Sequence, residues 1–226
     1  MLSSSCLLSS AYFAPIQWYQ KLNRYDFIYI EANDNFTKQT YRNRCVISTT
    51  NGIQVLTVPV EHDKTSLLYP SDKGGKSLMK DIRISNHGNW RHLHWNALTS
   101  AYGESPFFEY YEDDIRPFFE RKWSFLYDFN MEICTKMCEL LDIRPNIQLT
   151  SEYIPSDDMR LVGAGEPKDS CIVDYREVIR PKHPLPDNSF SVKPYYQVFE
   201  RKNGFIPNLS ILDLLFNMGN ESIFWL

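Results

Sequence analysis

The sequence contains 226 residues, and 28 acidic against 24 basic side chains give it a formal net charge of -4 at pH 7. This balance excludes nucleic acid as the expected partner, because proteins that grip a phosphate backbone carry a basic footprint. No apolar run approaches the ~20 residues of a membrane span. The hydrophobic content of 43% at this length is typical of a globular protein with a substantial core. We therefore expect one domain over residues 1–226.

The N-terminus and the cysteines indicate a cytoplasmic protein. Residues 1–10 contain five serines and no lysine or arginine, so they lack the charged and apolar regions of a secretory signal. The five cysteines are an odd number without a Cys-x-x-Cys pair, which favours reduced thiols over a disulfide framework or a zinc site. They are Cys6, Cys45, Cys134, Cys138 and Cys171. No residue pattern identifies a metal, a cofactor or an oligomeric state.

The first sixty residues predict a βαβ unit followed by a hairpin. Residues 5–12 read as a buried strand, Pro15 can begin a helix, and residues 26–32 read as a second strand. A strand, a helix and a strand within about 30 residues favour a parallel sheet. The dipeptide Asn51-Gly52 between the strand-like runs 44–49 and 53–60 predicts a tight hairpin.

The middle of the chain predicts mostly helices. A strand over 81–85 precedes a helix that Asn89 caps and that ends near Gly103. Pro106 then restarts a helix, and Pro117 breaks it before a long helix over 117–141.

Prolines punctuate residues 144–204, where we expect extended segments and ordered loop, with a strand at 147–150. Asn208 is the predicted cap of a final helix over 209–218 that Gly219 closes. The predicted fold class is thus α/β, with a mixed sheet that opens with a βαβ unit plus a β-hairpin, a helical middle section and a C-terminal helix.

Residues 89–95 hold two of the five histidines and two of the five tryptophans. A neutral imidazole near pH 7 can act as acid, base or metal ligand. On a helix, His92 and His94 point about 200° apart, so they are poorly placed to share one metal ion. Either one of them faces a pocket, or it is a buried histidine with a satisfied hydrogen bond.

Arg42, Asn43 and Arg44 lie together in a stretch without acids. Two guanidiniums and an amide suit the recognition of phosphate or carboxylate, because arginine presents a rigid pair of donors. The same residues also fit a solvated strand edge whose arginine stems cover aromatic rings. Both interpretations stay open.

The last helix carries polar residues where a core helix would be apolar. Ser210, Asp213 and Asn217 share one face by their spacing. A carboxylate there needs a partner, within a structural network or at a site wall.

Charge is segregated along the chain. Residues 73–94 contain five bases and one acid, whereas residues 104–114 contain five acids and no base. Three consecutive acids, 112–114, diverge on a helix, so we expect a solvated acidic face and not a Mg²⁺ site.

Several motifs together resemble one family. They keep their order and spacing from near residue 5 to the C-terminus: Tyr12-Phe13-Ala14-Pro15, Tyr41-Arg42-Asn43-Arg44, Asn51-Gly52 with Leu56-Thr57-Val58-Pro59-Val60, His94-Trp95 with Ala101-Tyr102, Pro106-Phe107-Phe108, and the run from Leu209 to Asn217. On these motifs the chain resembles the WbqC-like family. This resemblance implies a link to bacterial surface-polysaccharide (O-antigen) gene clusters and the transfer of a glycyl or other aminoacyl group to a sugar. Lys193 departs from the family pattern, because longer relatives carry a histidine at the corresponding place.

We therefore put first an acyl or aminoacyl transferase acting on a sugar. His94 would be its general base, since an imidazole is matched to neutral pH. The anionic donor would lie against Arg42, Asn43 and Arg44, and the faces of sugar or donor against Tyr12, Trp95, Tyr102 and Tyr196. The family-like segments add Gln197, Asp213 and Asn217 as substrate-binding candidates. The alternatives are a nucleotide-binding enzyme of the adenylate-forming or nucleotidyl-transfer type and a non-catalytic binding or scaffold protein.

Overall fold

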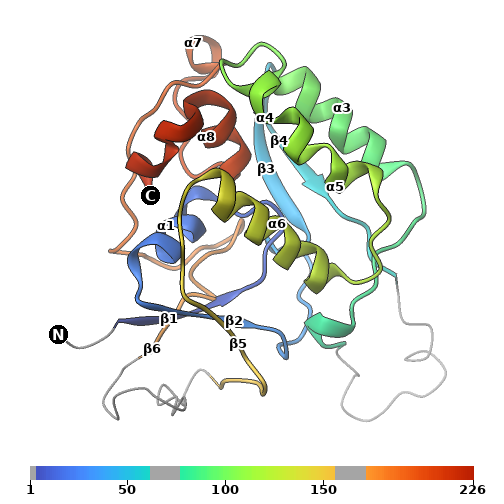
Figure 1. Cartoon of the computed structure of the whole chain (residues 1–226), viewed down its shortest axis with the longest axis vertical. Coiled ribbons are helices and arrows are strands. Elements are labelled where there is room, and N and C mark those ends of the chain that lie inside the picture. The colour runs from blue at the N-terminus through green and yellow to red at the C-terminus, as the bar shows by residue number, and fades with distance from the viewer. Residues whose placement is uncertain (1–3, 62–76, 156–171) are drawn as a thin grey trace.

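The structure, a computed structural model, describes residues 4–61, 77–155 and 172–226 (Figure 1). Its first layer is a four-stranded parallel sheet in the order β5-β2-β1-β6. The strands are β1 (Ser5–Ser9), β2 (Phe27–Glu31), β5 (Ile147–Leu149) and β6 (Ile172–Asp174). Helix α1 (Ile16–Arg24) connects β1 to β2, so the predicted βαβ unit is confirmed.

Successive side chains of β1 and β2 point to opposite faces of the sheet, and apolar residues lie on both faces. Cys6 pairs with Ile28 on the face that contacts the main core, and Figure 1 shows α1 and α8 on that side. Leu7 pairs with Tyr29 on the opposite face, where Ile154 joins them in a smaller apolar cluster. Strands buried on both faces read as continuous apolar runs, which is the pattern of parallel sheets.

A hairpin of β3 (Arg44–Thr49) and β4 (Gly52–Thr57) forms a second, two-stranded antiparallel sheet. The Asn51-Gly52 turn is confirmed, and Gly52 has the positive φ of 99° that such a turn requires. The chain thus combines parallel and antiparallel pairing, with the hairpin as a separate sheet.

The helical middle section is confirmed, although its predicted boundaries are partly wrong. Its helices are α3 (Trp90–Tyr102), α4 (Phe108–Ile115), α5 (Pro117–Glu120) and α6 (Leu126–Leu140). The predicted helix over 117–141 is two helices, because the chain extends at Arg121. There Ser124 O accepts a hydrogen bond from Ile84 N at 3.0 Å, and Leu126 N donates to Ile82 O at 2.8 Å.

The predicted strand over 81–85 is also wrong. A 3-10 helix, η1 (Met79–Asp81), precedes two isolated bridges, in which Arg83 pairs with Phe125 and Ile84 with Val60. The backbone of this segment pairs with two different neighbours, Val60 and Phe125, and so forms no continuous strand ladder. Two of the bases counted in the sequence, Lys73 and Lys76, lie outside the described residues, as does Cys171.

The C-terminal region contains α7 (Glu200–Asn203), α8 (Ile211–Met218) and a closing 3-10 helix, η2 (Gly219–Trp225). The cap of α8 is Ser210, whose hydroxyl accepts from Leu212 N at 3.3 Å, so the predicted cap Asn208 is wrong. Instead, Asn208 accepts a hydrogen bond from Gln17 N at 2.9 Å. No helix in the described part of the chain is long and apolar enough to cross a bilayer.

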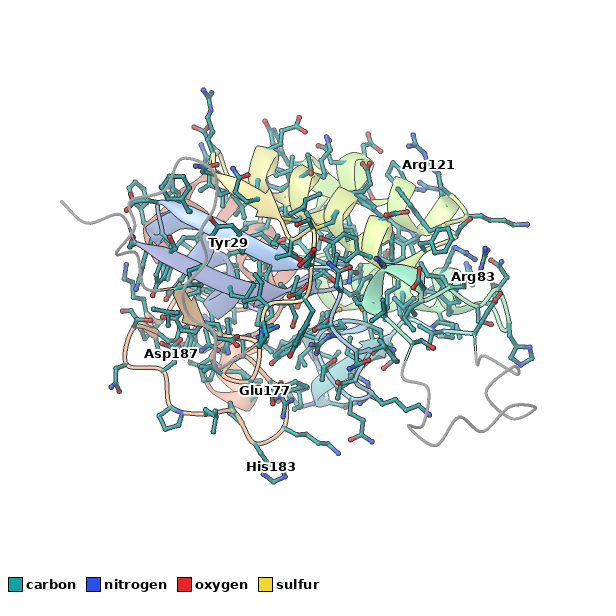
Figure 2. All side chains as sticks on the ribbon, turned by 90° about the horizontal axis from the view of Figure 1, so that it is seen from below. Tyr29, Arg83, Arg121, Glu177, His183 and Asp187 are labelled. Atoms are coloured by element: carbon teal, nitrogen blue, oxygen red, sulfur yellow. The ribbon has the colours of Figure 1, made fainter. Side chains whose placement is uncertain are left out.

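Figure 2 shows the two ends of the molecule, with Tyr29 on the parallel sheet at one end and Arg83 and Arg121 beside the helical section at the other. The aromatic residues anticipated from composition fill the space between. Phe13, Phe118, Phe119 and Phe129 contact one another or Tyr12 within the main core.

We predict that Gly219→Ala lowers the free energy of unfolding more than Gly88→Ala does. Both glycines have positive φ, 59° and 69°, which costs a side chain about 1–2 kcal/mol. An added Cβ at Gly219 would also lie 2.7 Å from the ring of Phe107, whereas nothing lies within 4 Å at Gly88. Urea denaturation of both variants measures the difference, and equal losses would contradict the close packing of Phe107 on Gly219.

Candidate functional site

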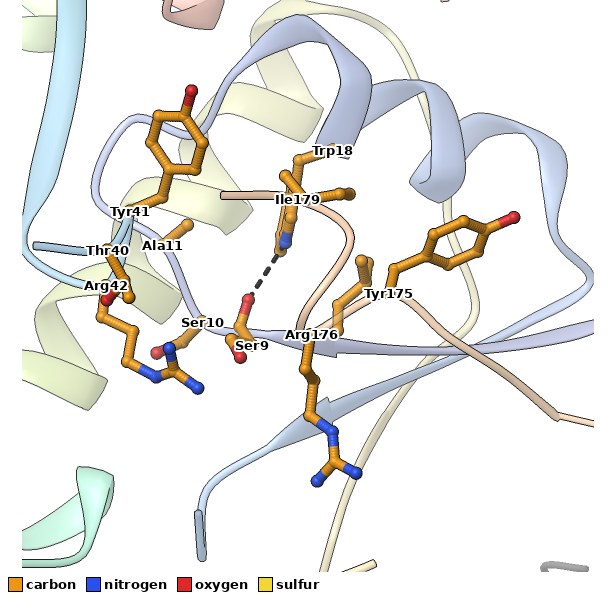
Figure 3. Close-up of a pocket in the computed structure, with 11 residues that line it drawn as sticks. Ser9, Ser10, Ala11, Trp18, Thr40, Tyr41, Arg42, Tyr175, Arg176 and Ile179 are labelled. Atoms are coloured by element: carbon orange, nitrogen blue, oxygen red, sulfur yellow. Dashed lines mark hydrogen bonds between the residues drawn. The ribbon is translucent and has the colours of Figure 1, made fainter. Parts of the chain in front are cut away.

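A narrow pocket opens where the strands of the parallel sheet end. Strand β1 is followed in the chain by β2, its neighbour on one side, whereas its neighbour on the other side is β6, the last strand of the sheet in sequence. The direction in which the chain adds strands therefore reverses beside β1. Ligands of open parallel sheets bind at the carboxyl ends of strands at such a point. The pocket has about 10 Å³ of free space, the size of one water molecule. Its lining includes Ser9, Ser10, Thr40, Arg42, Tyr175 and Arg176 (Figure 3).

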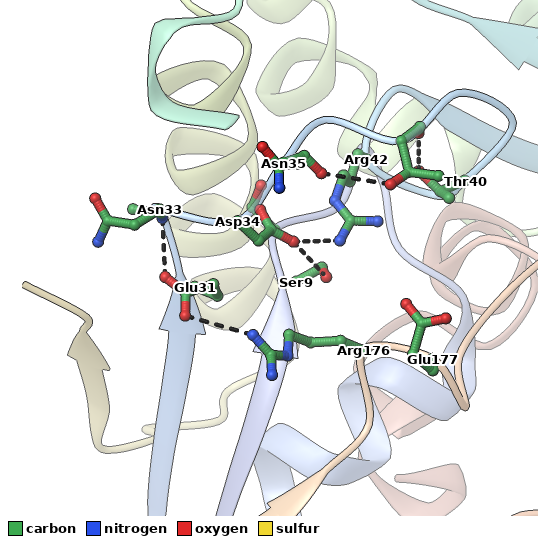
Figure 4. Close-up of polar contacts among 12 residues, drawn as sticks. Ser9, Glu31, Asn33, Asp34, Asn35, Thr40, Arg42, Arg176 and Glu177 are labelled. Atoms are coloured by element: carbon green, nitrogen blue, oxygen red, sulfur yellow. Dashed lines mark hydrogen bonds and ion pairs between the residues drawn. The ribbon is translucent and has the colours of Figure 1, made fainter. Parts of the chain in front are cut away.

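An incompletely satisfied ion pair lies at this edge (Figure 4). Arg42 Nη2 donates to Asp34 Oδ2, and both residues are 5% exposed. Ser9 Oγ donates to the same carboxylate oxygen at 3.4 Å. Asp34 Oδ1 and Arg42 Nε are buried without a hydrogen-bond partner among the described residues. Orphaned polar atoms cost free energy, so a buried pair that keeps two of them is a candidate binding group.

The electrostatics of Asp34 fit a proton acceptor. Burial raises the pKa of its carboxyl above the ordinary value, and the neighbouring Arg42 guanidinium opposes that rise. A raised carboxyl pKa brings the group closer to neutral pH, where general bases work best.

A second arginine at the same edge is fully engaged. Arg176 contacts Asp174 through Nε and Nη2, donates to Ile154 O at 2.8 Å and lies 3.5 Å from Glu31 Oε2. Glu31 also accepts from Asn33 N at 2.8 Å, from Thr150 Oγ1 at 2.7 Å and from Ile154 N at 2.9 Å. This network ties the segments that follow β2, β5 and β6 together, so Arg176 and Glu31 shape the pocket beside Arg42.

The first backbone amides of α1 are already hydrogen-bonded within the chain. Ile16 N donates to Leu209 O at 3.0 Å, and Gln17 N donates to Asn208 Oδ1 at 2.9 Å. The backbone amides that receive phosphate in many parallel-sheet proteins are therefore occupied by the chain itself. Any anion at this edge must be held by side chains, of which Arg42 has a free N–H.

His94 lies in the aromatic core and not at the sheet edge. It is 6% exposed, its Nδ1 lies 3.0 Å from the hydroxyl of Tyr12, and its ring contacts Trp90 and Phe119. Burial lowers the pKa of its imidazole to about 4, against a backbone hydrogen bond with Thr57, so the ring is neutral at pH 7. This geometry matches the open alternative of a buried histidine with a satisfied hydrogen bond. Its role as a general base remains a prediction.

Three other candidates, together with Tyr195, converge on the buried carboxylate of the candidate Asp213. Asp213 is fully buried, and its oxygens accept from Tyr102 at 2.7 Å and from Tyr195 at 2.6 Å. Gln197 Nε2 and Asn217 Nδ2 lie 3.3 and 3.4 Å from Oδ1. Burial raises the pKa of Asp213 to about 6 in spite of these donors. The network joins α3, α8 and the segment before α7, in agreement with the structural interpretation of the polar face.

The remaining candidates are dispersed. Asn43 Nδ2 donates to Val58 O at 2.9 Å, and Arg44 begins β3. Trp95 is half-buried between Phe108 and Phe119, whereas Tyr196 is exposed. The sequence-predicted residues therefore form separate groups: Arg42 at the sheet edge, Tyr12 with His94 in the core, and the set around Asp213.

Sequence reasoning missed Asp34, Glu31 and Arg176. The available signal was positional, because Glu31 ends an apolar strand and Asp34 follows it by three residues. Polar residues just after a strand of a parallel sheet are placed at its ligand-binding edge. Lys193, the departure from the family pattern, donates to Phe224 O at 2.8 Å on the surface.

Comparison with known protein families identifies one family. The model of the WbqC-like protein family matches residues 10–168, which include Asp34 and Arg42. An uncharacterized protein of Mycobacterium tuberculosis, Rv1507c, is 25% identical over 198 residues, covering 83% of this chain and 81% of its own length. No solved structure matches the chain.

We predict that His94 and Asp213 give opposite pH dependences of stability. The imidazole pKa falls from 6.5 to about 4 on folding, so its contribution is present above pH 6.5 and is lost as the pH falls. The carboxyl pKa rises from 3.8 to about 6, so its contribution is present at low pH and is lost as the pH rises. Each amounts to roughly 3 kcal/mol at about 1.4 kcal/mol per unit.

Urea denaturation between pH 4 and 7 tests this pair with His94→Gln and Asp213→Asn. Relative to the wild type, His94→Gln should lose stability as the pH rises, and Asp213→Asn should gain it. Parallel profiles for all three proteins would show that neither group titrates differently in the folded state.

Proposed function

Because this chain belongs to the WbqC-like protein family, we propose that it is a transferase that moves an acyl or aminoacyl group to a sugar in bacterial surface-polysaccharide synthesis. The surface-polysaccharide context and the sugar acceptor come from the family resemblance. The observation that carries the catalytic part is the Asp34–Arg42 pair with its two orphaned atoms at the carboxyl edge of the sheet. The four cysteines of the described residues, Cys6, Cys45, Cys134 and Cys138, are buried free thiols, which supports a reducing compartment, and we place the activity in the cytoplasm.

In this proposal Asp34 is the general base. The hydroxyl or amine of the sugar attacks the acyl carbon, its proton passes to Oδ1 of Asp34, and the leaving group departs with the electrons of the broken bond. The proton on Asp34 is then available to the leaving group. Arg42 holds the developing negative charge or an anionic group of the donor through its free N–H, as a guanidinium is suited to do. This assigns to Asp34 the role that sequence reasoning gave to His94.

The pocket size limits what enters it. About 10 Å³ admits one functional group and excludes a sugar ring. The reacting group would therefore enter beside Ser9 and Arg42, the two lining residues that contact Asp34, while the rest of the substrate lies outside. Thr40 and Tyr41 line the pocket and directly precede Arg42 in sequence. We expect them to contact the part of the substrate that stays outside the pocket.

We predict that Asp34→Asn lowers turnover at least 100-fold with a smaller change in KM, the usual loss for a general base. Arg42→Gln should raise KM for the donor about tenfold or more, because a charge-assisted contact is lost. Mass spectrometry would follow acyl and glycyl transfer from activated donors to a panel of nucleotide-activated amino sugars.

Asp128→Asn and Arg144→Gln are matched controls, because both side chains are exposed and remote in sequence from the pocket. Undiminished transfer by Asp34→Asn would remove Asp34 from the mechanism. No transfer by the wild type across the panel would count against the transferase and favour the non-catalytic scaffold. Circular dichroism of each variant separates loss of activity from loss of fold.

A nucleotide-binding enzyme of the adenylate-forming or nucleotidyl-transfer type is the second candidate. The parallel βαβ sheet and the pocket at its carboxyl edge favour it, since nucleotides bind there in open α/β folds. The occupied amides of α1 argue against the usual phosphate contact. This candidate predicts that ATP with Mg²⁺ raises Tm of the wild type and not of Arg42→Gln. No shift in a thermal screen of nucleotides would count strongly against it.

A further inference from the structure

A second and far larger pocket lies between the start of α3 and α5, and its chemistry is different. It has about 350 Å³ of free space, within the range of small-molecule sites, against about 10 Å³ at the sheet edge. We name it the basic pocket and define it by Arg91, His92, Trp95, Arg116, Glu120 and Lys122. We propose that the basic pocket binds a small ligand carrying a diphosphate group.

The lining of the basic pocket has an excess of positive charge. Three cationic side chains line the basic pocket, Arg91, Arg116 and Lys122, against a single carboxylate, Glu120. That carboxylate pairs with Arg116 Nε at 2.7 Å, but both side chains are more than half exposed, and such pairs contribute little. A ligand with two or more negative charges would be attracted in spite of Glu120, whose charge opposes it.

Arg91 donates to an amide oxygen and, within the described part of the chain, lacks the carboxylate partner that Arg42 and Arg176 have. Among the partly or fully buried arginines of the described chain, Arg42, Arg176 and Arg180 pair with carboxylates. Arg44 and Arg91 have no ion pair with a described residue, and of these two only Arg91 lines the basic pocket. Arg91 is half-buried and donates from Nη2 to the amide oxygen of Asn86 at 2.8 Å, and its Nε has no hydrogen-bond partner among the residues that the structure describes. Burial without a compensating acid lowers the pKa of its guanidinium. A half-buried cation that lacks an anion is a site at which an anionic ligand gains most.

Aromatic rings hold these cations in place. The guanidinium of Arg91 lies 4.8 Å from the ring of Trp90, and that of Arg116 lies 6.0 Å from the ring of Trp95. Guanidiniums over aromatic faces are oriented before any ligand arrives, which lowers the entropy lost on binding. The pocket also lies at the N-terminal turn of the 13-residue α3, where the helix dipole adds positive potential.

Geometry favours a diphosphate over a single carboxylate. Two arginine forks and a lysine provide more donors than one carboxylate can accept, whereas two linked phosphates offer enough oxygens for all three. The pocket lies between α3 and α5. Figure 2 shows Arg121, which directly follows α5, at the opposite end of the molecule from Tyr29 of the parallel sheet. The inference does not depend on the proposed transfer reaction.

Calorimetric titration with inorganic pyrophosphate tests the proposal. The wild type should bind it, and Arg91→Gln should weaken binding at least tenfold, or about 1.4 kcal/mol. Binding should weaken steeply as sodium chloride rises from about 50 to 200 mM, because exposed charges are screened. Arg144→Gln removes the same charge from an exposed position outside the pocket and should bind as the wild type does.

Arg42→Gln separates this pocket from the sheet edge, because it too should bind pyrophosphate as the wild type does. No binding by the wild type would overturn the proposal. Equal affinities of the wild type and Arg91→Gln would overturn it as well, and so would equal losses in Arg91→Gln and Arg144→Gln, which indicate diffuse attraction. Loss of binding in Arg42→Gln alone would place the phosphate at the sheet edge and support the proposed function instead.

Discussion

The pairing of β1 on both sides is the constraint on which the rest of the molecule depends. With β2 on one side and β6 on the other, β1 has no free edge, and its alternate side chains enter two separate apolar clusters. The carboxyl ends of three parallel strands are thereby brought to one place. Charged residues that follow those strands must then be buried together, and they remain stable only by pairing with one another.

Local chemistry made much of the fold predictable. The βαβ unit, the Asn51-Gly52 hairpin and the helix that ends at Tyr102 follow from apolar spacing and turn residues close in sequence. Predictions were wrong where a distant segment competes for the backbone. The stretch 82–84 exchanges backbone hydrogen bonds with 124–126, one donated in each direction. This pairing replaces the predicted strand and divides the predicted helix. Propensity cannot anticipate a choice that depends on a partner forty residues away.

The candidate site was less predictable for the same reason. The sequence shows Arg42 as part of a cluster of hydrogen-bond donors. Its partner Asp34 is recognisable as part of a site only once the sheet places the two side chains together. Glu31 and Arg176 lie 145 positions apart in the chain and meet at one edge. Residue type alone also did not indicate where His94 lies, since an imidazole has suitable chemistry for a base and this one is placed among aromatic rings. The polar face of the last helix indicated that Asp213 needs partners. The sequence did not indicate that two of these partners are Tyr102 and Tyr195.

The junction between the loop before α1 and the start of α8 has a consequence for how the chain is made. Ser210 and Ile211 bond to Phe13 O and Ala14 O at 2.8 and 2.9 Å, and Ser210 N bonds to Val46 O at 2.8 Å. The opening βαβ unit therefore lacks these hydrogen bonds until the ribosome has synthesised α8, nearly two hundred residues later. Contacts this distant in sequence slow folding. Before α8 packs against it, the apolar face of α1 is exposed, and such transiently exposed apolar surface promotes aggregation unless a chaperone binds it.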